Sequence, residues 1–189
     1  MSSPSIPALS GLPPEEYALR EAASGLIGLA RDPTFVEAHI LPLLAEARDA
    51  RDWYVARCWE GREGSYSLQV FVWPPESRTQ VHDHTSWGVF CSVVGSMFEE
   101  RYERLDDGSQ LNHARLKKVW QRAWGTRDGV STVLPYDGGI HRVGNPGSGT
   151  ATPCIFTDLV WEGWTAVTTN PPATTSAIGS VTRGMSPMR

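Results

Sequence analysis

Apolar residues near the start of the chain follow the spacing of one helix face. Over residues 13 to about 30 they stand three or four positions apart, at Leu19, Ala22, Ala23, Leu26 and Leu29. Asp32-Pro33 is typical of a helix N-cap followed by proline in the first turn, which predicts a second helix to about Arg48. Pro42 lacks an amide hydrogen, so we expect it to kink or split this second helix.

After Asp52 the pattern changes to short runs rich in Val, Tyr, Trp, Phe and Thr, separated by turns rich in Gly, Pro and Asp. We predict strands at Trp53–Trp59, Tyr66–Trp73, Gln80–His84, Gly88–Arg104, Ala114–Arg122, Ser131–Leu134, Gly139–Gly144, Cys154–Trp161 and Trp164–Thr168. Many short strands separated by such turns are typical of an antiparallel sandwich or barrel. The pattern therefore predicts a mainly β fold with two N-terminal helices packed against it.

The same patterning divides the chain into four segments of one domain. Residues 1–12 are rich in Ser, Pro and Gly, and we expect them to be flexible. Residues 13–50 form the helices and residues 51–169 the barrel. Residues 170–189 are rich in Thr, Ser, Pro and Gly, which predicts an extended or disordered tail.

Charge and cysteine content narrow the classes of function. Lys and Arg number 17 and Asp and Glu number 21, a net charge of −4, which argues against a nucleic-acid partner. No apolar run reaches the roughly 18 residues of a membrane span, and the N-terminus lacks a secretory signal pattern. Three cysteines make no disulfide framework. We therefore expect a cytoplasmic protein that binds neither membrane nor nucleic acid.

Three of the five histidines carry the strongest chemical signal. His82 and His84 flank Asp83, and alternate residues of a strand point to the same face. Two neutral imidazoles side by side on a buried face need a partner for their lone pairs, and a metal ion supplies one. His141 lies fifty-seven residues after His84, beside Gly138-Gly139, and on a facing strand it would supply a third nitrogen. The alternative is a chance pair on a surface strand.

The three histidines alone do not determine which metal ion binds. No acid follows His84 where a carboxylate ligand would be expected, so three neutral ligands would leave a divalent ion with its full charge. Such a centre suits an anionic chelating substrate and, with iron, subsequent O₂ binding. Zinc with a bound water would also accept three histidines. His39 and His113 are expected at the surface or the edge of the core.

Between about Tyr54 and Val143 the sequence resembles the cysteine dioxygenase family of cupins. The matching residues are Val72-Trp73, His82-Asp83-His84, Val94-Gly95 and Gly139-Ile140-His141-Arg142-Val143. The resemblance implies a cupin-type antiparallel β-barrel, a jelly roll, in which His82, His84 and His141 bind Fe(II). It also implies O₂ as co-substrate and a small thiol, such as cysteine or 3-mercaptopropionate, that is oxidised to a sulfinic acid.

Three features depart from that family's pattern. Gly88 stands where animal members have a cysteine cross-linked to tyrosine. Ala56 stands where many members have an arginine that anchors the substrate carboxylate. Bacterial 3-mercaptopropionate dioxygenases also lack that arginine. Where the family has a Ser-x-His-x-Tyr triad, this chain has Cys154, Phe156 and Asp158.

The candidate catalytic residues beyond the ligands are Tyr54, Asp158 and Trp87. Tyr54 would donate a hydrogen bond to substrate, Asp158 would have a role different from that of the missing triad, and Trp87, with Trp73, would wall a dry cavity. Their structural alternatives are packing for Tyr54, a strand-end carboxylate for Asp158, and barrel core for the tryptophans. Arg101 and neighbouring charged residues are interpreted as a solvated face, and Arg142 as a structural salt bridge.

The sequence thus predicts an enzyme, an iron-dependent thiol dioxygenase. One alternative keeps the three-histidine cupin oxygenase and changes the chemistry to another oxidation of a specialised substrate. A second alternative is a cupin that binds metal or ligand without catalysis. The sequence leaves the substrate and the oligomeric state open.

Overall fold

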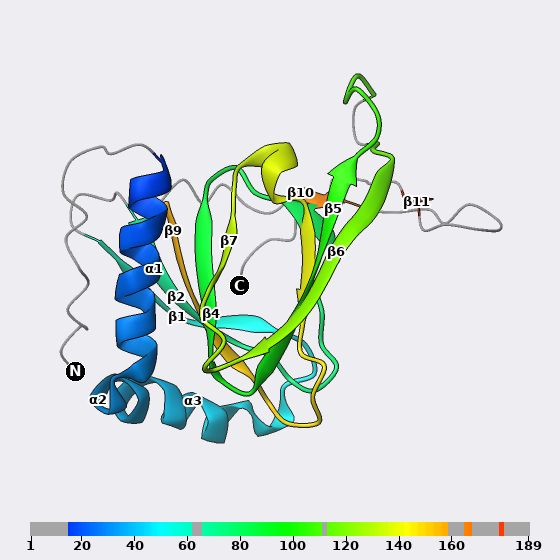
Figure 1. Cartoon of the computed structure of the whole chain (residues 1–189). Helices are drawn as coiled ribbons and strands as arrows, with labels where there is room; N and C mark the ends of the chain where they lie inside the picture. The colour runs from blue at the N-terminus through cyan, green and yellow to red at the C-terminus, as the bar shows by residue number, and fades with distance from the viewer. Residues whose placement is uncertain (1–14, 62–65, 111–112, 159–164, 168–177, 180–189) are drawn as a thin grey trace.

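Two antiparallel sheets form the body of the fold, in the computed structural model of residues 15–61, 66–110, 113–158, 165–167 and 178–179 (Figure 1). The strands are β1 (Tyr54–Glu60), β2 (Tyr66–Val72), β3 (Val81–Asp83), β4 (Gly88–Val94), β5 (Ser96–Arg104), β6 (Leu116–Gly125), β7 (Ser131–Val133), β8 (His141–Gly144), β9 (Thr152–Asp158), β10 (Thr165–Val167) and β11 (Ile178–Gly179). One sheet has the order β1-β2-β9-β4-β7, and the other has the order β10-β3-β8-β5-β6-β11.

The strands pair in a nested order, from an inner hairpin outward. β5 pairs with β6, β4 with β7, β3 with β8 and β2 with β9, all antiparallel. Successive pairs alternate between the two sheets, which is the strand order of a jelly roll. The predicted fold class, mainly β with N-terminal helices packed against a jelly roll, is confirmed.

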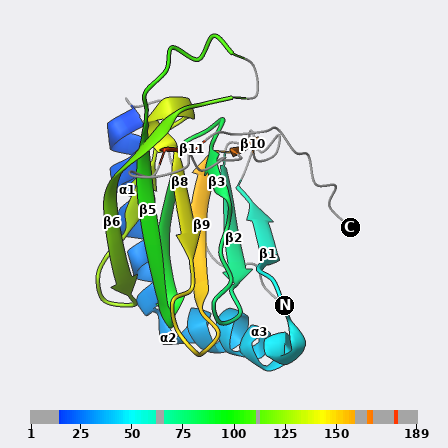
Figure 2. The same ribbon diagram turned by 90° about the vertical axis from the view of Figure 1, so that its right-hand side faces the viewer.

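The helices precede the strands, as predicted. α1 (Glu15–Arg31) packs along β4, while α2 (Pro33–Phe35), the π-helical η1 (Val36–Ile40) and α3 (Leu41–Glu46) follow. Figure 2 shows α2 and α3 beneath one end of the strands. None of the described helices is long and apolar enough to cross a membrane.

The predicted start of the second helix and its predicted interruption near Pro42 are both confirmed. The Asp32 carboxylate accepts a hydrogen bond from the Thr34 amide at 2.9 Å, and Pro33 occupies the first turn. The helix then passes through η1 before α3, with Pro42 in the first turn of α3. Proline fits there because the first amides of a helix have no partner within the helix.

The single strand predicted over Gly88–Arg104 is two strands in different sheets. β4 ends at Val94 and β5 begins at Ser96, and Gly95 between them has a φ of 76°. This left-handed conformation suits glycine and turns the chain from one sheet into the other. The apolar pattern continues across the turn, so it does not mark the break.

The predictions for the chain ends fall mostly outside the described residues. The flexible N-terminus predicted at 1–12 lies outside them, as does the tail predicted at 170–189, apart from Ile178–Gly179. That pair forms β11, which pairs with β6 and which the sequence pattern did not predict.

Two apolar clusters use opposite faces of the same sheet. On β2, Leu68 and Val70 pack with the helices, whereas Phe71, together with Phe90 and Trp124, packs between the sheets. β2 is therefore buried along its whole length. The apolar cluster between the sheets extends as far as the predicted metal-binding histidines.

The backbone packed against Gly139 leaves no room for a side chain, so we predict that Gly139→Ala destabilises the protein. A Cβ atom there would lie 2.0 Å from the Leu134 carbonyl oxygen, and the backbone would have to move. We expect the free energy of unfolding to fall by about 1–3 kcal/mol or more, measured by urea denaturation. The control is Gly28→Ala, where nothing lies within 4 Å and alanine favours the helix. Equal stability of the two variants would contradict the prediction.

Candidate metal centre

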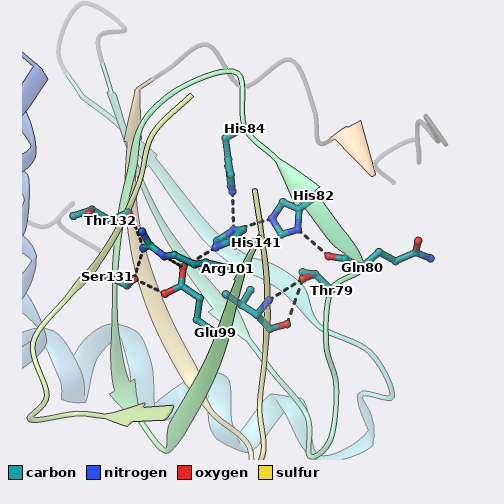
Figure 3. A network of polar contacts seen from close by, with 10 residues as sticks. Thr79, Gln80, His82, His84, Glu99, Arg101, Ser131, Thr132 and His141 are labelled. Carbon is teal, nitrogen blue, oxygen red and sulfur yellow. Dashed lines mark hydrogen bonds and ion pairs between the residues drawn. The ribbon is translucent and has the colours of Figure 1, made fainter. Parts of the chain in front are cut away.

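The three predicted ligands converge at one end of the barrel interior. His82 on β3 pairs directly with His141 on β8, and His84 follows the end of β3. The Nε2 atom of His141 lies 2.9 Å from Nε2 of His84 and 3.1 Å from Nε2 of His82 (Figure 3). A metal ion at about 2.1 Å from each nitrogen is compatible with this spacing. The third histidine lies on the neighbouring strand of the same sheet, and not on a facing strand as predicted.

Hydrogen bonds on the far side of two rings aim their Nε2 atoms at one point. The His82 Nδ1–H donates to the Gln80 carbonyl oxygen at 3.0 Å, and the His141 Nδ1–H donates to Glu99 Oε1 at 2.9 Å. Because Nδ1 carries the hydrogen in each neutral ring, Nε2 keeps its lone pair. This is the tautomer that a metal ligand requires, and the donor set fits a divalent ion.

A short turn ties the second ligand to the third. The Tyr136 amide donates to the His84 carbonyl oxygen at 2.6 Å. Tyr136 has a φ of 53° and begins the 3-10 turn η4 (Tyr136–Gly139), which leads into His141. The close approach at Gly139 therefore helps to fix where both ligands stand.

Burial keeps the three imidazoles neutral. It lowers the pKa of His84 to about 4, against a weaker opposing effect of the Glu99 charge. Burial also lowers the pKa of His82 and of His141 well below the usual value, and the neighbouring histidines add to this effect. Their lone pairs are therefore available at neutral pH without competition from protons.

Glu99 is a functional residue that the sequence interpretation missed. Its side chain is 0% exposed and accepts hydrogen bonds from His141, from Ser131 and, at 3.0 Å, from Arg101 Nε. Burial raises the pKa of Glu99, and the hydrogen bonds and charge of its donors oppose that rise. Glu99 follows Met97 by two residues on the same face of β5, and this alternation was the available signal.

Arg101 belongs to this network and not to a solvated face, which corrects the prediction. Its guanidinium donates to Ser131 Oγ at 2.9 Å and to the Thr132 carbonyl oxygen, and lies 5.4 Å from the Trp120 ring centroid. A buried carboxylate needs such a partner, because its desolvation is otherwise costly. Figure 3 shows the chain of contacts from Arg101 through Glu99 to His141.

The outer face of the same strands carries a separate charge cluster. Glu100 accepts from Arg142 Nε at 2.6 Å, from Lys118 at 3.1 Å and from the Tyr102 hydroxyl at 3.0 Å. The predicted structural salt bridge of Arg142 is confirmed.

A cavity of about 40 Å³ lies beside the histidines. Its lining residues come from both sheets and are Gln69, Phe71, Trp73, His84, Gly88, Phe90, Val133, His141, Val143, Ile155 and Thr157. Among these described residues none is Lys, Arg, Asp or Glu. The Phe90 ring lies 5.7 Å from the His141 ring, so apolar surface reaches the ligands directly.

None of the other predicted catalytic residues is among the described residues that line this cavity. Tyr54 begins the edge strand β1 and is 38% exposed. Trp87 packs against the helix-side cluster, and its carbonyl oxygen accepts from Thr157 Oγ1 at 2.9 Å. Asp158 ends β9, opposite Tyr66, and its side chain lies outside the described part. Their catalytic roles stay predictions, whereas Trp73 does line the cavity.

No protein-family model matches the chain. Among solved structures, it is similar to an oxalate oxidase in complex with glycolate, with 16% identity and a TM-score of 0.41 over 53% of this chain. That match covers 45% of the oxidase, so the chain spans less than half its length.

The names of two other similar structures describe their folds. The Schizosaccharomyces pombe Cnp3 cupin domain matches at 14% identity and a TM-score of 0.40, over 55% of this chain and 59% of that domain. A Klebsiella pneumoniae protein with a double-stranded β-helix domain matches at 12% identity and 0.40, over 61% and 84%. The strand order of the chain itself establishes the fold, and these likenesses add no argument about activity.

We predict that Glu99→Gln weakens metal binding about 10–100-fold, because His141 loses its carboxylate acceptor. Zn(II) affinity measured by chelator competition checks this. Glu100→Gln is the matched control, since it makes the same change one residue away on the opposite face. Equal affinities of the two variants would contradict a role for Glu99 in placing His141.

We predict that the metal-free protein loses stability as the pH falls from about 6.5 to 4. The folded state keeps the three imidazoles neutral, whereas the unfolded chain protonates them near the ordinary pKa of 6.5. Each histidine therefore contributes a loss of up to about 1.4 kcal/mol per pH unit below 6.5.

Chemical denaturation with a chelator present, at a series of pH values, measures this loss. His84→Gln should make the pH dependence shallower, and His113→Gln, outside the cluster, serves as the control. A stability that is constant over this window would show that the imidazoles are not held neutral.

Proposed function

We propose that this chain is an Fe(II)-dependent dioxygenase that adds O₂ to the sulfur of a small thiol. One observation carries the proposal: three neutral imidazole nitrogens converge where a largely apolar cavity begins. Three protein ligands leave positions open for substrate and O₂. The resemblance to the cysteine dioxygenase family supports iron and a thiol. We further propose that it works in the cytoplasm on a small molecule.

The reaction balances without an outside reductant. A thiol and O₂ give a sulfinic acid, so sulfur loses four electrons and the two oxygen atoms gain them. Bound iron would supply the redox chemistry that lets O₂ react with the thiol.

The protein's own residues would hold the centre and exclude water. Gln80 and Glu99 orient His82 and His141. Phe71, Phe90 and Ile155 surround the cavity with apolar side chains, which limits the access of water to the reacting sulfur. Gly88 leaves space in the lining where animal members of the family carry their cysteine.

A second candidate is a three-histidine oxygenase that acts on a different kind of substrate. The observation that favours it is the cavity lining, in which no described residue is an arginine or lysine to anchor a carboxylate. The oligomeric state is open under both candidates.

We predict that protein purified without added metal contains iron and consumes O₂ when small thiols are added. His82→Ala and His141→Ala should each lose most of the iron, because two remaining ligands hold the ion poorly. Metal analysis, an oxygen electrode and mass spectrometry of the sulfinate measure these outcomes.

His39→Ala is the control, since it removes a histidine that packs against Phe35 and Trp59 instead. Stoichiometric zinc together with no thiol-dependent O₂ uptake by the iron-loaded protein would refute the proposed dioxygenase. O₂ uptake with a substrate that lacks sulfur, and none with thiols, would establish the second candidate.

A further inference from the structure

Two buried polar atoms in the cavity lining have no hydrogen-bond partner among the described residues. The Gln69 side chain is 4% exposed, and its Nε2 donates to Ser67 Oγ at 3.0 Å while its Oε1 has no partner. Trp73 is 1% exposed, and its indole Nε1–H has no partner. Both residues line the cavity beside His84 and His141. One acceptor and one donor are thus available there.

The position of Gln69 on β2 and of Trp73 directly after it explains why both reach the cavity. Gln69, Phe71 and Trp73 are alternate residues of one extended segment, so their side chains share the face toward the barrel interior. Gln69 lies opposite Ile155 on β9, and Ile155 lies opposite Phe90 on β4. The Phe90 ring in turn contacts His141. The amide therefore belongs to the row of side chains that faces the metal ligands.

The surroundings favour an uncharged ligand. The remaining lining residues are mostly apolar, and the Thr157 hydroxyl is engaged with the Trp87 carbonyl oxygen and the Ser86 hydroxyl. The nearest cation in the network, Arg101, is paired with Glu99. A carboxylate or ammonium group that points away from the metal ligands, toward Gln69 and Trp73, would lose its water without an opposite charge from the described lining residues, which is costly. An amide or hydroxyl group would lose less and would find hydrogen-bond partners.

We propose that the cavity binds a small uncharged molecule bearing an amide or hydroxyl group, recognised by Gln69 Oε1 and the Trp73 indole N–H. This inference rests on the proposed function in one respect: the atom of the molecule that coordinates the metal is a thiol sulfur. Gln69 and Trp73 are then specificity-determining residues. This ligand class differs from the carboxylate-bearing thiols that the family resemblance suggests.

The test compares two thiols that differ in one group, 3-mercaptopropanamide and 3-mercaptopropionate. Their binding to the Zn(II)-loaded protein is measured without O₂ by calorimetry, so that no oxidation is needed. We expect the amide to bind at least about tenfold more tightly than the carboxylate. Gln69→Leu and Trp73→Phe should each weaken amide binding about threefold to tenfold, the effect of one neutral hydrogen bond.

Two matched variants separate recognition from packing. Trp124→Phe makes the same change as Trp73→Phe in the same cluster, at an indole nitrogen that also lacks a partner among the described residues, but outside the cavity lining. Gln121→Leu repeats the glutamine change on β6, where the side chain is exposed. Neither should alter the affinity for 3-mercaptopropanamide.

The proposal is overturned if 3-mercaptopropionate binds as tightly as the amide, a comparison that needs no variant. It is also overturned if Gln69→Leu has no effect, or if Trp73→Phe and Trp124→Phe weaken binding equally. Its failure differs from that of the proposed function. Amide binding that depends on Gln69, without thiol-dependent O₂ uptake by the iron-loaded protein, would refute the dioxygenase alone. O₂ uptake with 3-mercaptopropionate and indifference to Gln69 would refute the ligand class alone.

Discussion

The hydrogen bond from His141 to the buried carboxylate of Glu99 is the interaction on which the centre depends. It fixes the ring of the ligand that lies nearest both other histidines. The carboxylate is stable in this place because Ser131 and Arg101 also donate to it. Since these residues stand on β5, β7 and β8, the geometry of the ligand depends on contacts that join both sheets. A shift between the sheets would disturb His141 before it disturbed the core.

Neither the metal ligands nor the described residues of the cavity lining carry a charge. Three neutral imidazoles contribute no charge to a bound ion, and the described residues of the lining contribute none either. A divalent ion would therefore be the main charge in the interior, with the Arg101–Glu99 pair neutral overall beside it. Substrate selection would then depend on the atom that coordinates the ion and on neutral hydrogen bonds. Under the proposed function, neutral hydrogen bonds would take the place of the arginine that the resemblance leads one to expect at Ala56.

Local patterns in the sequence predicted the mainly β class and the histidine cluster, whereas the jelly roll came from the resemblance to the cysteine dioxygenase family. Asp32-Pro33 marked a helix start, and His82 and His84 on one strand marked a site. The break at Gly95 was missed because apolar residues continue on both sides of it. Glu99 and Arg101 were missed because their charges look solvated until the register places His141 opposite Arg101. Partners of a buried charge come from distant strands, and periodicity does not reveal them.

The nested strand pairing also has a consequence for how the chain reaches its folded state. The inner hairpin of β5 and β6 joins neighbouring segments, whereas β3 and β8 are separated in sequence by β4 to β7. His82 and His141 are separated by that whole loop, so closing it carries a larger entropy loss than closing the hairpin. Contacts between such distant segments slow folding. We therefore expect the histidine nitrogens to come together after the inner hairpin has formed, so that an ion would meet a barrel that is already partly assembled.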